Sequence, residues 1–524
     1  MEDVKKQTGV KRIVLITLVA LLVVGGSVAA FVLTDKSTKE TYFLAEKNTI
    51  DVLTEELEQR FEPELSWSEQ VEENPTESVV ELSAEYNDPM GESYGLFSPE
   101  QIINNSTITI TTGTDKNEKL LTSKVEGSLG GFELGSIDLH VTSDDVMVGL
   151  PFLEETLQLK GDDFGSLLSQ FDPYTFSGEE TLDFNMVFED NSILSEEDLD
   201  YLKEAYATYL YDELPESAFE SANEDVKVES ETVKTEKITL HLTEEEVRNI
   251  LSDLFSKMAE DDRLKEMIKE QYQLQTFGAF TVPQASMLMD EANQIVEDFT
   301  TAMEEASEEV LEFSIPNGLT STIWINDNLV VKRDFEVELG PNENEMVSFY
   351  LNGTHLFNNS NQSFDYEIGF KDAYDEGEFA LSGELSFEDG DINDSISLTA
   401  EEMVLTYEST ETLNDTERKF DRNISFDEGY GVVGTLIWSG SASYDNDQMN
   451  SQHELSIESP EISQDLFTLH VSKEAKTISS VEIPSSDQVK DLGSMDINEL
   501  MMYFETEVTP QFEQWMYGIM GPGF

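Results

Sequence analysis

Alternation of apolar and polar residues is the feature that most constrains the fold of this chain of 524 residues. Between residues 314 and 483 the hydrophobic pattern keeps a period near two, which is typical of strands with one buried and one solvated face. Turn-forming clusters of Asn, Asp, Gly and Pro recur roughly every 15 residues, so the strands should be longer than average. An unbroken series of long strands predicts an antiparallel meander that forms a wide, curved sheet.

The chain before residue 314 mixes helical and strand periodicity. The predicted helices carry Ile50, Leu53, Leu57 and Phe61; Leu199, Leu202, Tyr206 and Tyr209; Val247, Ile250, Leu251, Leu254 and Phe255; and Met289, Ala292, Ile295, Val296, Phe299 and Met303. The predicted strands carry Val80, Leu82, Ala84 and Tyr86; Ile137, Leu139 and Val141; Leu182, Phe184, Met186 and Phe188; and Ile238, Leu240 and Leu242. Ser195 with Asp198 and Thr243 with Glu246 predict capping boxes at the starts of two helices. A last predicted helix precedes Pro510 and carries Leu500, Met501, Phe504 and Val508.

One segment, residues 13–33, contains no charged residue. As a helix it would be about 31 Å long, which matches the hydrocarbon core of a bilayer. Basic residues precede it, so the positive-inside tendency places the N-terminus in the cytoplasm and the C-terminal bulk outside the cell. A cleaved signal peptide is the alternative, with residues 13–24 as its apolar core and Ser27, Val28 and Ala29 at the cleavage site. The first interpretation predicts a single-pass protein of the cell membrane.

These elements predict an α+β fold in which an N-terminal transmembrane helix is followed by long curved antiparallel sheets, half-barrel-like and packed with amphipathic helices. The predicted parts are a cytoplasmic tail (1–12), the transmembrane helix (13–33), a mixed α+β exported domain (41–313), an antiparallel β-meander domain (314–490) and a C-terminal helix and tail (491–524).

Charge and cysteine content exclude several functions. The chain has 110 acidic and 30 basic residues, a net charge of −80, which argues against nucleic-acid binding and against electrostatic docking on anionic lipid head groups. Hydrophobic residues make up 39% of the chain, enough for a sizeable core. The absence of cysteine excludes disulfides, thiolate metal sites and a catalytic Cys.

No motif predicts chemistry. The five histidines lack HExxH spacing, and neither a GxSxG elbow nor a phosphate-binding or dinucleotide-binding glycine loop is present. The segment 389–394 begins like a calcium-binding loop, but Asp394 stands where a Gly is needed and Ala400 where a Glu is needed, so a hairpin turn is predicted instead. We therefore predict a non-enzymatic protein with no cofactor, and assign no catalytic, cofactor-binding or metal residue. A hydrolase that uses a carboxylate pair is the weaker alternative.

Two segments, 146–152 (VMVGLPF) and 159–165 (LKGDDFG), together with the predicted first helix and the long strands, carry a resemblance. The chain resembles uncharacterised single-span exported proteins of Gram-positive bacteria and, more loosely, the lipoprotein-carrier half-barrel superfamily. In that superfamily a curved antiparallel sheet wraps helices around an apolar cavity. The resemblance covers most of residues 41–490, and it implies neither catalytic residues nor specific ligand contacts.

Two functions follow as hypotheses. In the first, the exported part binds or carries a lipid or another apolar envelope molecule. In the second, it is a structural or regulatory surface protein that engages an envelope protein or the cell wall. The partners predicted are thus the membrane through residues 13–33, an apolar ligand or an envelope protein, and no nucleic acid. The residues predicted to line a cavity, or else to fill a core, are Phe335, Phe364, Tyr366, Phe379, Phe387, Trp438 and Tyr444, with Ile295, Phe299 and Met303 as a lid or plug.

Overall fold

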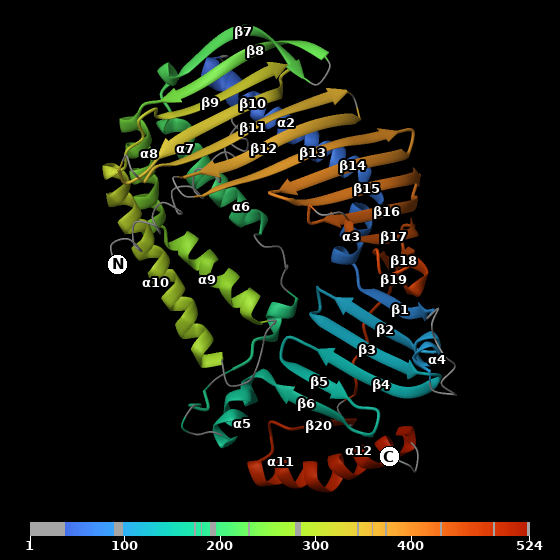
Figure 1. Ribbon diagram of the computed structural model, residues 1–524. Coiled ribbons are helices and arrows are strands. Elements are labelled where there is room, and N and C mark those ends of the chain that lie inside the picture. Colours follow the sequence, from blue (N-terminus) through green and yellow to red (C-terminus); the bar gives the residue numbers. More distant parts are fainter. Residues whose placement is uncertain are drawn as a thin grey trace. The chain divides into compact units, whose positions relative to one another are not determined.

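The structure is a computed structural model that describes residues 37–87, 98–171, 174, 176–179, 181–188, 195–228, 231–277, 285–342, 345–358, 360–372, 375–429, 432–485 and 488–520. The chain divides into two compact units (Figure 1). Unit 1 comprises Met1–Arg60, Asn191–Ser386 and Asp394–Leu405, and unit 2 comprises Phe61–Asp190, Phe387–Asn393 and Thr406–Phe524. Each unit is described by itself. The two units are defined by which residues lie close together in space. They do not test the domain limits predicted from the sequence, which stay predictions.

The sheet of unit 1 is antiparallel in all its described pairings, in the order β7–β8–β9–β10–β11–β12–β13. Its strands are β7 (Phe219–Val228), β8 (Glu231–Leu242), β9 (Leu319–Asn326), β10 (Leu329–Leu339), β11 (Val347–Asn358), β12 (Asn361–Lys371) and β13 (Glu376–Glu388). Two further strands, β14 (Asp391–Ala400) and β15 (Met403–Asn414), have residues in both units. Most of these strands have ten or more residues, as the turn spacing predicts.

The helices of unit 1 bury one face of this sheet. They are α2 (Thr38–Arg60), α6 (Glu196–Leu202), α7 (Thr208–Glu213), α8 (Glu244–Glu260), α9 (Asp262–Phe277) and α10 (Ala285–Glu309). Phe255 of α8 and Ile238 of β8 are fully buried in the main core, together with Met303 of α10. Thr243 and Glu246 form the predicted capping box at the start of α8, and Ser195 caps α6. The predicted helices and strands of this region are therefore confirmed.

The sheet of unit 2 has the order β16–β17–β18–β19–β1–β2–β3–β4–β5–β6–β20, and only the β6–β20 pair among its described pairings is parallel. The strands are β1 (Thr76–Tyr86), β2 (Thr107–Asp115), β3 (Leu120–Leu129), β4 (Phe132–Val141), β5 (Asp145–Gly149), β6 (Thr156–Lys160), β16 (Glu417–Asp427), β17 (Val432–Tyr444), β18 (Gln448–Glu458), β19 (Phe467–Thr477) and β20 (Val489–Asp491). Strand β1, from the first part of the chain, thus pairs with β19, from its last part.

Short helices cover two parts of this sheet. They are α3 (Glu62–Glu73), α4 (Pro99–Asn104), α5 (Phe164–Phe171), α11 (Ile497–Tyr503) and α12 (Thr509–Met520). Trp67 of α3 packs on Met449 and Ala475 of β18 and β19. At the other end, Phe152 after β5 contacts Phe512 and Trp515 of α12, with ring centroids 5.3 and 5.7 Å apart.

The predicted fold class needs a correction. No helix in the part of the chain that the structure describes is both long and apolar enough to cross a membrane. Helices α2 and α10 have sufficient length, with 23 and 25 residues, but both carry acidic side chains along their length. Instead, the described residues contain twenty strands in a mostly antiparallel arrangement with amphipathic helices. The predicted fold with a transmembrane helix, and the single-pass placement in the cell membrane, are therefore wrong for the described chain, while residues 13–33 themselves lie outside the described residues.

Three local predictions also differ from the structure. Residues 182–188, predicted as a strand, contain a short 3-10 helix at Phe184–Val187. Helix α2 is present, but the predicted apolar residues Ile50 and Leu57 are exposed on it, because its buried side carries polar groups that pair with the sheet. The C-terminal helix does not end before Pro510: α12 follows the π-helical segment Phe504–Val508 directly and continues to Met520.

Candidate functional site

The sheet of unit 2 has two chemically different faces. Cα partners across neighbouring strands point the same way, and alternate residues of one strand point opposite ways. One side, here called the apolar face, carries Val80, Leu82, Ile108, Ile110, Val125, Ile137, Leu455, Leu469 and Val471. The intervening residues, such as Glu81 and Thr109, form the polar face. The alternation expected of a sheet with one wet side is thus present from β18 to β4.

Two shallow hollows lie over β15–β18, and the residues that line both include the polar-face residues Lys419, Ser441 and Gln452. Their volumes are about 280 and 470 Å³. Small and charged side chains line them, and no buried apolar wall encloses them. These hollows are therefore unsuited to an apolar ligand.

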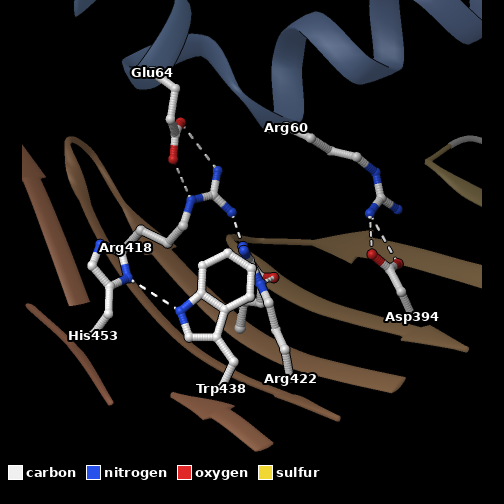
Figure 2. A network of polar contacts seen from close by, with 8 residues as sticks. Arg60, Glu64, Asp394, Arg418, Arg422, Trp438 and His453 are labelled. Atoms are coloured by element: carbon white, nitrogen blue, oxygen red, sulfur yellow. Dashed lines mark hydrogen bonds and ion pairs between the residues drawn. The ribbon is translucent and has the colours of Figure 1, made fainter. Parts of the chain in front are cut away.

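An ion-pair network joins α3 to one end of the apolar face (Figure 2). Arg418 of β16 donates from Nε to Oε1 of Glu64 in α3 at 2.6 Å, and from Nη1 to Oε2 of Glu411 in β15 at 2.6 Å. Arg422 donates from Nε to Oε1 of the same Glu411 at 2.7 Å. Arg418 and Glu411 are almost fully buried, so α3 is attached to the sheet by charges that water does not screen.

The network keeps its members charged. Burial opposes the charged form of Glu411, but hydrogen bonds from Arg422 and Arg418 outweigh this effect and hold its pKa below the usual range. Burial likewise opposes the charge of Arg418, and Glu64 and Glu411 raise the pKa of its guanidinium. Removal of any one partner would therefore leave a buried charge without compensation.

Arg422 also contacts two aromatic rings. Its guanidinium lies 4.3 Å from the ring centre of Phe420 and 4.7 Å from that of Trp438. The indole of Trp438 in turn donates to Nδ1 of His453 at 3.2 Å (Figure 2). Stacking on aromatic faces is a common mode of Arg binding, and it fixes the plane of the guanidinium.

The rest of the apolar face is uncovered by the described helices. Ile108, Val125, Ile137 and Ile457 are 46%, 37%, 49% and 52% exposed, although their side chains share one side of the sheet with buried residues. Exposed apolar side chains are unremarkable when they are scattered, but a row of them on neighbouring strands marks an interaction site.

Unit 1 repeats this arrangement. Beneath α2, Glu46 pairs with Arg333 at 2.7 Å, and Arg60 donates from Nη1 to both carboxylate oxygens of Asp394 at 2.9 and 2.8 Å (Figure 2). Farther along the same side of its sheet, Leu381 and other apolar side chains are exposed. The candidate calcium-loop residue Asp394 is thus a partner of an arginine. The turn at 389–390 joins β13 to β14, and the described residues contain no group of three or more metal-ligating side chains.

The residues predicted to line a cavity fall into three groups. Phe335 belongs to the packed core of unit 1, as does Met303 of the predicted lid, with Phe299 packed against it. Phe364, Tyr366, Phe387, Trp438 and Tyr444 are half-buried, and Phe379 is half-exposed. The predicted set therefore does not form one cavity. The sequence analysis did not single out Arg418, Arg422 and Glu411. These are charged residues at strand positions where the alternating pattern predicts an inward-facing apolar side chain.

Of the histidines, His355 in unit 1 is the most buried. Its Nε2 donates to Oε1 of Gln362 at 2.9 Å, its Nδ1 accepts from the hydroxyl of Tyr366 at 3.2 Å, and its ring stacks on Phe357 at 4.0 Å. Burial lowers the pKa of His355 from 6.5 to about 4, against the hydrogen bond to Gln362 and with a smaller contribution from Arg333.

This depressed pKa predicts an acid-dependent loss of stability in unit 1. Between pH 6.5 and pH 4 the unfolded chain binds a proton at His355 and the folded chain does not, so the free energy of unfolding falls as the pH falls, by about 3 kcal/mol in total. Arg333, the charged group that acts on it, keeps its positive charge in this range. The measurement is urea unfolding of the wild type and of His355→Asn at each pH, and the difference between them should shrink as the pH falls. A constant difference would show that His355 is protonated normally in the fold.

Comparison with known proteins does not identify a family. No protein-family model matches the chain, and no curated protein matches it. Among solved structures, OccK3 (OpdO) of Pseudomonas aeruginosa is 6% identical with a TM-score of 0.22, over 77% of this chain and 95% of that one. OmpF of Salmonella typhi, in complex with daunomycin, is 9% identical with a TM-score of 0.16, over 78% and 99%. OmpT, an outer membrane protein of Vibrio cholerae, is 6% identical with a TM-score of 0.16, over 77% and 98%. TM-scores this low carry no argument, and the resemblance drawn from the sequence stays a prediction.

Proposed function

We propose that unit 2 binds a lipid or another apolar molecule on its apolar face. The observation that supports this most is the row Ile110, Val125 and Ile137 on the three neighbouring strands β2, β3 and β4, with Ile108 beside it on β2. Apolar surface left in water is unfavourable by about 25 cal/mol per Å², and a ligand that covers the row recovers this free energy. Function here is binding, with no catalytic group required.

The strands that carry the row favour an apolar ligand over a protein segment. Strands β2 and β3 each pair with a neighbour on both sides, so their backbone groups are already hydrogen-bonded. A peptide added to a sheet edge obtains its affinity from such backbone groups, and the middle of a sheet does not provide them. A molecule bound on this face contacts side chains only. A hydrocarbon chain can bind in this way because it forms no hydrogen bonds.

The test is a pair of substitutions on adjacent residues of β2. Ile108→Glu should raise the dissociation constant of an uncharged fluorescent apolar probe at least about tenfold, because a carboxylate against hydrocarbon must be desolvated. Thr109→Glu places the same charge on the polar face and should leave the constant within about twofold. Both sites are partly exposed, so both variants should fold, which circular dichroism checks. Equal effects of the two variants, or no probe binding by the wild type, would contradict the proposal.

A further inference from the structure

The distribution of charge over the sheet of unit 2 is far from even. The acidic residues of β1, β18 and β19, and those of β16 before its bulge, all occupy positions of the polar face. They are Glu77, Glu81, Glu85, Glu417, Asp421, Glu454, Glu458 and Glu474. In a chain with 110 acidic residues, these strands thus place no carboxylate on the apolar face. Repulsion among the acidic residues does not by itself explain why they all lie on one face, because acids placed in the loops would also be far apart.

Basic side chains do reach the apolar face. Arg422 is the Cα partner of Trp438, and Lys473 is the Cα partner of Ser451 and Val80. Burial lowers the pKa of His453, and the positive charges of Arg422 and Lys473 lower it further. The Glu411 and Glu64 carboxylates pair with Arg418 and Arg422, whereas Lys473 forms no ion pair within the described residues.

The guanidinium of Arg422 has capacity for another partner. Only its Nε donates a hydrogen bond within the described residues, to Glu411, and its side chain is 13% exposed. Contacts with the rings of Phe420 and Trp438 restrict the position of the group, while both Nη atoms stay without an acceptor in the described part of the chain. A planar, pre-oriented guanidinium of this kind suits a carboxylate or a phosphate.

The dimensions agree with a lipid. Arg422 lies on β16 and Ile108 on β2, and the strands between them follow in the sheet as β16–β17–β18–β19–β1–β2. These five inter-strand steps cover about 24 Å at ~4.8 Å each. Leu455, Leu469 and Leu82 lie between them on the same face. An acyl chain fills about half of a ~30 Å hydrocarbon core, so it fits within this span.

We infer that the ligand of the apolar face is a lipid with an anionic head group, bound at Arg422 and attracted from farther away by Lys473, with its chain over Leu455, Leu469 and Leu82. This inference rests on the proposed function and specifies its substrate class. It also reverses the conclusion from net charge alone, because β1, β18, β19 and β16 before its bulge carry their acidic residues on the polar face.

The experiment compares two ligands of equal chain length on the full-length protein. Hexadecanoate, ionised at pH 8, and uncharged hexadecanol compete for the same fluorescent probe below their aggregation concentrations. The wild type should bind hexadecanoate about tenfold more tightly, the gain expected of a charge-assisted hydrogen bond. Arg422→Gln with Lys473→Gln should bring the ratio of the two affinities close to one, while Arg422→Lys should keep part of the preference. Lys419→Gln, the same loss of charge on the polar face, is the matched control and should keep all of it.

The outcomes separate the two proposals. Equal binding of both ligands by the wild type overturns the head-group inference and leaves apolar binding standing. Loss of the preference in Lys419→Gln to the same extent overturns it as well, since a general charge effect would then explain the result. If neither ligand displaces the probe, the proposed function fails and this inference fails with it. Because the first comparison uses the wild type alone, the result does not depend on how well a variant folds.

Discussion

Replacing Arg418 by Met is expected to lower the free energy of unfolding of unit 2 by about 3–5 kcal/mol. The Arg418 side chain is 3% exposed and makes hydrogen bonds to Glu64 and Glu411. Without it, Glu411 keeps only Arg422, and its carboxylate stays buried with half of its compensation. Helix α3 also loses the ion pair that attaches it to β16, and only the packing of Trp67 remains at this point.

Urea unfolding followed by circular dichroism measures this loss. Lys419→Met on the same strand removes one charge from the polar face and should change stability by less than about 0.5 kcal/mol. The double variant Arg418→Met with Glu411→Leu should recover only part of the loss, because it removes the uncompensated carboxylate but takes from Arg422 its acceptor. A single variant as stable as the wild type would show that the network is not a structural element.

Phe335→Ala is expected to lower the free energy of unfolding of unit 1 by a similar 3–5 kcal/mol, through lost contacts and the void left behind. The Phe335 side chain is 3% exposed and packs edge-on against Phe349, with ring centroids 6.0 Å apart. Phe379 is the matched control, because it carries the same side chain on the same sheet but is 50% exposed. Phe379→Ala should cost less than about 1 kcal/mol. Phe364, half-buried beside His355, should fall between them.

Thermal or urea unfolding of the three variants checks this order. Equal losses at positions 335 and 379 would contradict the division of this sheet into a packed part and an open part. The result also bears on the question that the sequence left open, whether the apolar strand positions fill a core or line a site. The structure answers it differently along one sheet, with Phe335 in the core and Phe379 outside it.

The hydrophobic periodicity predicted most helices and strands correctly. It predicted poorly which of their side chains are buried. The alternation of Phe364, Tyr366 and Ile368 does form a strand, and the Thr243 capping box does start a helix, because both signals are local. Helix α2 was predicted with the wrong buried side. Its buried Glu46 and Arg60 have partners, Arg333 and Asp394, that are hundreds of residues away in sequence. Such pairs depend on register, which a single sequence does not reveal.

The candidate site was partly within reach of the sequence. Arg418, Phe420 and Arg422 alternate on one strand, so two arginines on the side expected to be apolar already indicated a polar role. Their partner Glu411 could not be chosen among so many acids without the pairing of the strands. The same holds for β1, whose position between β19 and β2 gives the apolar face its width. The hydropathy of residues 13–33 gives no information on these strand pairings. The fold class predicted from that segment needed correction.

The claim that the apolar face of unit 2 binds a lipid is tested most directly by identifying what it contacts in the cell. A photoreactive benzoylphenylalanine placed at position 108 of the full chain, irradiated in the cells that produce it, should form an adduct with the mass of a lipid. The same group at position 109, on the polar face, should form none. A protein adduct at position 108, or equal lipid capture at both positions, would contradict the account.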